Sequence, residues 1–173
     1  MNDFDPHLNS SEDFIDLLNK HQNIIHKICH LYRSTQEERE DLFQEISIQL
    51  WNAYPQFKGH SKFSTWMYRV GLNTAITLHR KERKQIATSA LDEKVNLPYQ
   101  EEYDTSLDEK MKWLLEKLSR FSAIDKALVL LYLEDKKFEE IGETLGISSV
   151  NARVKMNRIK KKLKSMLNNE SYE

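Results

Sequence analysis

Helix-breaking residues are scarce in this chain, and their scarcity limits what it can fold into. The 173 residues include only four glycines and three prolines, the two residues least compatible with a helix interior. Apolar residues recur at three- and four-residue steps over residues 14–32, 42–51, 63–74, 107–118 and 152–163, as one face of an amphipathic helix requires. We find no alternating pattern typical of strands. The sequence therefore predicts an all-α fold and argues against an enzyme domain rich in turns.

The helical spacing fails over residues 88–105. This stretch contains Pro98 and five acidic residues but few apolar ones, a composition typical of a linker. A chain of this length accommodates one domain or two small ones. We therefore predict two small helical domains, residues 1–86 and 106–173, joined by an acidic linker at residues 87–105.

The net charge of -1 is the sum of opposed blocks. Residues 61–86 hold six basic residues and one acidic residue, and residues 148–173 hold seven and two. Either block alone is compatible with a solvated helix face. Two such blocks at helical spacing indicate two contacts with a polyanion.

The sequence also indicates the cellular compartment. Cys29 is the only cysteine, which excludes an internal disulfide and a multi-cysteine zinc module and suits a reducing compartment. The first eleven residues lack an apolar signal core, and no run approaches the roughly 18 apolar residues of a membrane span. We expect a soluble, cytoplasmic protein with no membrane insertion.

A metal site is the one alternative that the histidines and the cysteine raise. His26, Cys29 and His30 are close in sequence, but Cys29 lies on the apolar helix face and no fourth ligand is near. No phosphate-binding glycine loop and no nucleophile-base pattern is present. We therefore expect a non-enzyme without a metal or cofactor.

The C-terminal segment has the pattern of a helix-turn-helix, with a short helix over residues 138–145, a turn at 146–148 and a longer helix from Ser149. In the longer helix, apolar residues at steps of four and three make one buried stripe. The opposite surface carries long polar side chains without matching acids, and the candidates for DNA contact are Asn151, Arg153, Lys155, Arg158 and Lys162. The alternative is a basic helix that caps a bundle or binds an acidic partner.

Aromatic and basic residues alternate over residues 57–69. Such a segment suits unpaired nucleotides, because any base can stack on a ring while cations hold the backbone. Phe63, Trp66 and Trp51 lie on the inward stripe, so burial explains them at least as well. The stronger candidates for DNA contact are the loop residues Phe57, Lys58, His60 and Lys62. Further candidates are Arg69 and Asn73, one and two turns into the following helix, and Arg80 in its basic tail.

These segments resemble the extracytoplasmic-function (ECF) sigma factors of bacterial RNA polymerase, from about Asp13 to Leu167. Residues 41–46 resemble the family's acidic polymerase-binding helix, and residues 57–70 followed by Asn73 resemble its promoter-melting and minus-10 segment. Residues 141–148, with the later basic run, resemble the helix-turn-helix that reads the minus-35 element. At the start of the last helix the family usually has a threonine followed by valine, lysine, serine and arginine. This chain has the sequence NARVK at residues 151–155, which differs from that pattern but still contains two basic residues.

The resemblance implies a sigma factor that works by binding. Its expected partners are core RNA polymerase, promoter DNA and an anti-sigma factor. The residues expected to dock on polymerase are Asp41, Gln44 and Glu45. The first domain would capture a flipped minus-10 base and hold the duplex open, and the second would grip the minus-35 major groove.

Three rival functions remain open at this point. A helix-turn-helix regulator would bind DNA without binding core polymerase. A helical adaptor would bind only protein, although the basic excess of residues 61–86 argues against it. A helical metal-dependent enzyme would need metal at His26, Cys29 and His30, which a metal analysis of the purified protein would detect.

Overall fold

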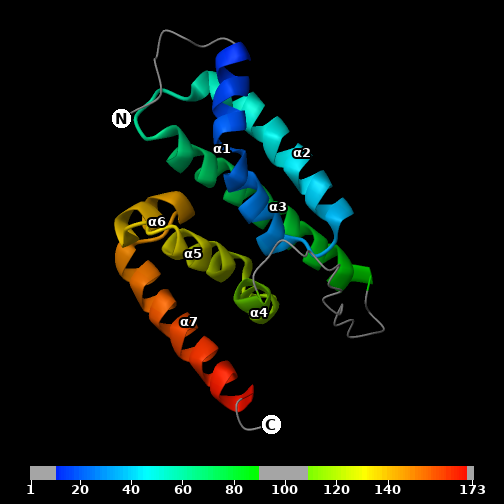
Figure 1. Ribbon diagram of the computed structural model, residues 1–173, viewed down its shortest axis with the longest axis vertical. Coiled ribbons are helices and arrows are strands. Elements are labelled where there is room, and N and C mark those ends of the chain that lie inside the picture. Colours follow the sequence, from blue (N-terminus) through cyan, green and yellow to red (C-terminus); the bar gives the residue numbers. More distant parts are fainter. Residues whose placement is uncertain (1–10, 90–108, 171–173) are drawn as a thin grey trace. The chain divides into compact units, whose positions relative to one another are not determined.

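The computed structural model describes residues 11–89 and 109–170 (Figure 1). Within these ranges the chain forms seven α-helices, one turn of 3-10 helix and no strand, so the all-α prediction is confirmed. The described helices form two compact units, α1–α3 and α4–α7. The predicted acidic linker lies largely outside the described residues, but α3 continues to Ser89, three residues past the boundary expected at residue 86.

The first unit comprises α1 (Ser11–Tyr32), α2 (Gln36–Ala53), a 3-10 turn η1 (Tyr54–Gln56) and α3 (Phe63–Ser89). The turn between α1 and α2 is short because Thr35 caps α2. Its hydroxyl accepts a hydrogen bond from the backbone N–H of Glu38 at 3.2 Å, and the Glu38 carboxylate accepts from the backbone N–H of Thr35 at 3.3 Å. Pro55 follows the end of α2, and helices usually end at or before the residue that precedes a proline.

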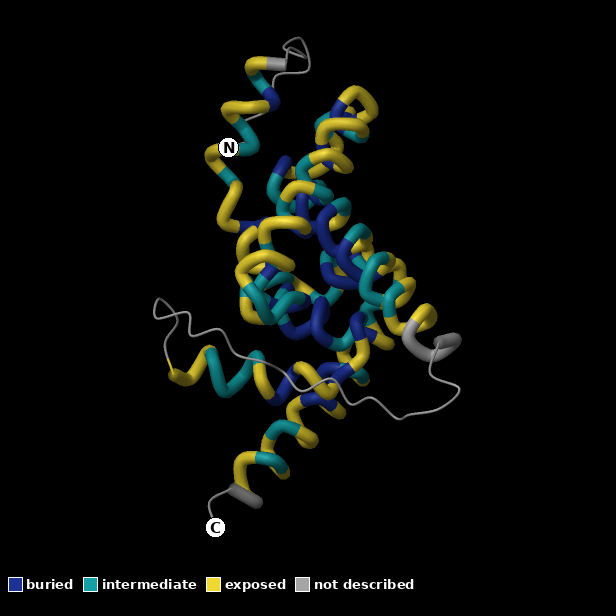
Figure 2. The backbone as a smooth tube through the Cα atoms, turned by 90° about the vertical axis from the view of Figure 1, so that its right-hand side faces the viewer, coloured by how far each residue is buried: buried dark blue, intermediate teal, exposed yellow. Residues whose placement is uncertain are grey.

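All three α-helices of this unit pack against one another, and their inward stripes form its core. The fully buried side chains include Ile25 and Ile28 of α1, Ile46 and Leu50 of α2, and Met67 and Leu72 of α3. Gly71 of α3 lies where the three helices meet, since a Cβ there would stand 2.8 Å from Cδ1 of Ile28 in α1 and 3.4 Å from Cγ2 of Ile46 in α2. Figure 2 shows buried and exposed stretches alternating along the helices, as one-sided packing requires.

Two local predictions in this unit are wrong. The sequence places Trp51 on the inward stripe, but this residue is 47% exposed, and its ring forms a T-shaped contact with that of Phe14 at a centroid distance of 5.2 Å. The sequence also predicts Ser61 as the N-cap of the third helix, because serine is favoured at that position. Instead, α3 begins at Phe63, and the carbonyl of Lys62 accepts the first helical hydrogen bond, from Trp66 at 3.1 Å.

The second unit comprises α4 (Glu109–Leu118), α5 (Ala123–Leu133), α6 (Phe138–Leu145) and α7 (Ser149–Glu170). Ser122 caps α5, because its hydroxyl accepts a hydrogen bond from the backbone N–H of Asp125 at 3.2 Å. The predicted helix-turn-helix is α6, the turn and α7. Gly146 ends α6 with a φ of 68°, a left-handed conformation that favours glycine.

Candidate nucleic-acid interface

The buried stripe of α7 sets which of its side chains are free to meet a ligand. Ala152, Met156 and Ile159 are buried, as predicted, and Leu163 is half-buried. The first turn is fixed by the hydroxyl of Ser148, which accepts from the backbone N–H of Asn151 at 3.1 Å. The N-terminal turns of α7 therefore present their remaining side chains to solvent.

Several α7 cations contact groups of their own unit. The Arg153 guanidinium lies 5.3 Å from the centroid of the Phe138 ring. Lys160 lies over Tyr132 and donates to its hydroxyl at 2.6 Å. These contacts hold the charges on extended side chains while leaving both cations exposed, so they remain available to a polyanion.

The prediction that no acidic residue pairs with these cations is wrong for Lys155. Its Nζ lies 3.3 Å from Oδ1 of Asp125, with the two side chains 33% and 22% exposed. The prediction considered α7 alone, whereas Asp125 comes from the first turn of α5. The ion pair partly neutralises Lys155.

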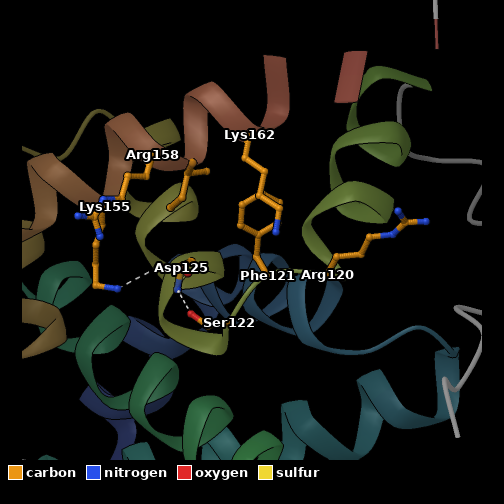
Figure 3. A pocket seen from close by; sticks show the side chains of 8 residues that line it. Arg120, Phe121, Ser122, Asp125, Lys155, Arg158 and Lys162 are labelled. Atoms are coloured by element: carbon orange, nitrogen blue, oxygen red, sulfur yellow. Dashed lines mark hydrogen bonds and ion pairs between the residues drawn. The ribbon is translucent and has the colours of Figure 1, made fainter. Parts of the chain in front are cut away.

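A cavity of about 230 Å³ lies between α7 and the start of α5 (Figure 3). Lys155, Arg158 and Lys162 of α7 line it, and Asp125 is its one acid. Lys162 lies above the Phe121 ring, with Nζ 4.6 Å from the centroid, and Arg120 lines the cavity while its guanidinium points away from Asp125 (Figure 3). The cavity is net positive and suits an anion.

Val150 and Val154 are exposed residues of α7 that the sequence prediction missed. Their side chains are 70% and 43% exposed, and a spacing of four puts them on one face. The prediction selected only polar residues from the surface opposite the buried stripe. The helical spacing itself would have found the two valines.

In the first unit, the loop before α3 carries exposed Lys58, His60 and Lys62, as predicted, around Gly59 at a φ of 69°. Phe57 departs from the prediction, because its side chain is only 6% exposed. Its ring packs on those of Phe63 and Trp66, with centroids 5.7 and 4.9 Å apart. The expectation of an exposed Phe57 ring is therefore wrong, and this ring supports the loop from beneath.

The long helix α3 continues this surface with polar side chains. Arg69, Asn73 and Arg80 are all exposed, and steps of four and seven put them on one face. Towards its C-terminal end α3 is tied to the turn that follows α1, since the Arg33 guanidinium donates to both carboxylate oxygens of Glu82 at 2.6 and 2.5 Å. The ion pair stabilises the part of α3 that carries Arg80.

A different surface lies on α2. Asp41 and Gln44 are exposed and Glu45 is half-exposed, where its carboxylate accepts from the Gln49 side chain at 3.0 Å. The same face continues with Ile48, 52% exposed, and Trp51, 47% exposed. The predicted acidic face thus carries an apolar extension that the sequence prediction did not include.

The structure gives no support to a metal site at Cys29. The thiol is buried, and burial raises its pKa to about 12, against smaller opposing effects of Arg33 and Arg39. His26 packs against the Phe43 ring at 4.8 Å. No group of three or more His, Cys, Asp or Glu side chains in the described ranges is placed to hold a metal ion.

Comparison with known proteins identifies both units. The model of Sigma-70 region 2 matches residues 17–85, and that of Sigma-70, region 4 matches residues 111–163. The ECF RNA polymerase sigma factor SigW of Bacillus subtilis is 27% identical over 165 residues, which cover 89% of this chain and 88% of SigW. SigE of Mycolicibacterium smegmatis, also an ECF sigma factor, is 26% identical over 91% of this chain, which spans 63% of SigE.

A solved structure agrees at the level of the fold. The sigma factor RpoE from Bartonella quintana, in a complex with the anti-sigma factor NepR, has a TM-score of 0.69 at 18% identity, covering 91% of this chain and 98% of that chain. No described helix is long and apolar enough to cross a membrane.

The helix-turn-helix and the two basic surfaces define an all-helical protein of the DNA-binding class. The two family models together cover well over half of the sequence. The chain belongs to the sigma-70 family, within its ECF group.

Proposed function

We propose that this chain binds core RNA polymerase, directs it to specific promoters and assists strand opening. The observation that carries the proposal is the presence of both sigma regions, each with a basic exposed surface on its own folded unit. It acts by binding, without a catalytic centre, and in the cytoplasm, where polymerase and promoter meet.

The proposed polymerase contact is the α2 face of Asp41, Gln44 and Glu45. Charged rim groups steer association and fix its register, whereas a large apolar side chain that becomes buried supplies much of the affinity. Trp51 and Ile48, half-exposed and on the same face, are suited to that second role. The combination fits a protein partner better than DNA, because the face is acidic and apolar.

The proposed minus-10 contact is the loop of Lys58, His60 and Lys62 together with Arg69 and Asn73 of α3. The loop cations would hold the backbone of an opened strand, and the polar α3 side chains would meet the extruded base. Because Phe57 is buried, its proposed role changes from stacking to support of the loop. Arg80, farther along the same helix face, would extend the path of the backbone.

The proposed minus-35 contact is α7 lying in the major groove. Arg153 and Asn151 belong to the N-terminal turns of α7. In a helix-turn-helix, side chains from these turns of the second helix contact base edges. Arg158, Lys155 and Lys162, which line the cavity, would hold backbone phosphates beside the groove. Such contacts position the protein without specifying sequence.

An anti-sigma factor is the third proposed partner. The sigma factor RpoE of Bartonella quintana was solved bound to one, and the fold is shared. For this chain we infer a protein that competes with core polymerase and holds the chain inactive.

Run-off transcription with purified core polymerase tests the proposed function. Adding the chain should produce transcripts from a subset of a promoter library, and core enzyme alone should not. The double variant Asp41→Lys with Glu45→Lys should lose core binding and transcription but keep duplex binding. A chain that binds duplex DNA but never core enzyme would instead be a regulator, and one that binds neither would be an adaptor.

A further inference from the structure

The first two turns of α7 present apolar side chains outward at the place where a helix-turn-helix reads DNA. Val150 is 70% exposed and Val154 is 43% exposed. On a helix with 3.6 residues per turn, both lie opposite the buried stripe of Ala152, Met156 and Ile159. The centre of the outward face is therefore apolar in these turns, and the basic residues lie at its sides and farther along.

Neither the stability of the helix nor its core explains these two valines. Valine is β-branched and loses rotamer freedom in a helix, so it forms helices less well than most surface residues. Val150 is 70% exposed and Val154 43% exposed, and these exposed parts bury no surface in the free protein. The side chains become useful when a partner covers them.

The charges around the valines indicate which partner covers them. Arg153 flanks Val150 and Val154 on one side, and the cavity cations, including Arg158, lie on the other. An apolar strip between cations complements a major groove, whose phosphates lie at its edges and whose floor exposes the C5-methyl groups of thymines. A protein partner would instead have to be acidic at its rim and apolar at its centre.

We propose, on the basis of the proposed minus-35 contact, that Val150 and Val154 pack against thymine methyl groups and so select A·T pairs. Asn151 adds to this preference. Its side chain is exposed, and the hydroxyl of Ser148 engages its backbone N–H. A free carboxamide can pair with the N6 and N7 atoms of adenine, so the chain reads a thymine-rich step next to an adenine.

Replacing thymine by deoxyuridine tests this proposal, since it deletes only the methyl group. A duplex is first selected with the full chain from a pool with random base pairs, and each thymine is then replaced in turn. Burial of one methyl group is worth about 0.8 kcal/mol, so one or two replacements should weaken binding by about fourfold. The other replacements should have little effect.

Variants of the valines provide the second arm. Val154→Ala should bind the thymine duplex about fourfold more weakly and lose its sensitivity to deoxyuridine at one position, and Val150→Ala should do so at another. The salt dependence should not change, because no phosphate contact is lost. Leu133→Ala, at an apolar residue of α5 that is 50% exposed, is the matched control and should retain both deoxyuridine effects.

Three outcomes would overturn the proposal. Selected duplexes without thymine, or with thymines that deoxyuridine replaces at no loss, would refute the methyl contact while leaving minus-35 binding intact. Valine variants that weaken core or anti-sigma binding but not DNA binding would assign this face to a protein. Failure to select any duplex would refute the proposed minus-35 function together with this inference.

Discussion

Gly142 and Gly146 shape the turn of the helix-turn-helix for different reasons. A Cβ on Gly142 would stand 2.6 Å from the carbonyl oxygen of Ile147 and 3.2 Å from the backbone nitrogen of Ser149. Gly146 has open space around it but a φ of 68°. We expect Gly142→Ala to cost about 1–3 kcal/mol by overpacking and Gly146→Ala about 1–2 kcal/mol by backbone strain.

Hydrogen exchange measures these costs within each unit. Both variants should speed exchange in α5–α7 and leave α1–α3 unchanged, because the helices belong to separate compact units. Gly146→Asn is the control, since asparagine tolerates the left-handed conformation better than alanine. Normal protection of α6 and α7 in Gly142→Ala would contradict the close approach at this turn.

Cys29 should make stability depend on pH at the alkaline end. Burial raises its pKa from 9.0 to about 12, so above pH 9 the folded chain retains a proton that the unfolded chain loses. Stability should therefore fall from about pH 9 to pH 12, by up to about 1.4 kcal/mol per pH unit. Burial also raises the pKa of the Tyr32 hydroxyl above its ordinary value of 10.0. Above about pH 10, Tyr32 should therefore add to the loss of folding stability.

Denaturant unfolding at several pH values measures this fall, and Cys29→Ala should make it shallower. A thiol reagent gives an independent measurement. At pH 8 the folded protein should react slowly and the unfolded protein fast, since the buried thiol remains protonated. Rapid modification of the folded protein would show that the thiol is accessible.

At the scale of the elements, the sequence was sufficient for the helices and their buried stripes, because periodicity follows directly from helix geometry. It was insufficient for side chains whose surroundings come from another element. Phe57 is buried because Phe63 and Trp66 of α3 cover its ring, and Lys155 is paired because α5 places Asp125 beside it. The spacing of residues within one helix or loop cannot predict either contact, because each involves a second element.

Asp125 should weaken DNA binding by competing for Lys155. Asp125→Asn keeps the shape of the side chain and its backbone N–H, which Ser122 caps, but removes the one negative charge of the cavity. We expect tighter duplex binding and a log-log salt slope steeper by up to about 0.9, as one more phosphate contact forms. A titration of duplex affinity against salt concentration measures both quantities.

Two controls separate this effect from the general loss of an acid. Glu109→Gln removes the same charge from α4 without lining the cavity, so it should change affinity less. Adding Lys155→Ala to Asp125→Asn should abolish the gain. If the gain persisted in that double variant, another cation would be the one that Asp125 restrains.

At the scale of the whole molecule, the chain divides into two compact units. Each unit has its own buried core and its own proposed DNA surface, so a surface change in one should leave the other folded and functional. The sequence indicated this division through its two basic blocks. The sequence does not predict the apolar extension of the acidic α2 face, because the helical spacing places Trp51 on the inward stripe.

The triple variant with Lys58, His60 and Lys62 all changed to alanine should separate strand opening from promoter binding. All three side chains are exposed, so the fold of the first unit should be preserved, while the cations proposed to hold the opened strand are lost. Breaking base stacking costs a few kcal/mol, and without these contacts less of that cost is offset. Minus-35 duplex affinity should therefore remain while opening fails.

Permanganate reactivity of unpaired thymines, with core polymerase on a promoter that the wild-type chain opens, measures this separation. The triple variant should bind that promoter but leave its minus-10 thymines unreactive. Arg153→Ala, in the second unit, should instead lose promoter binding and opening together, since the groove contact comes before melting. A triple variant that opened the promoter normally and kept its minus-10 preference would show that the loop of the first unit does not hold the opened strand.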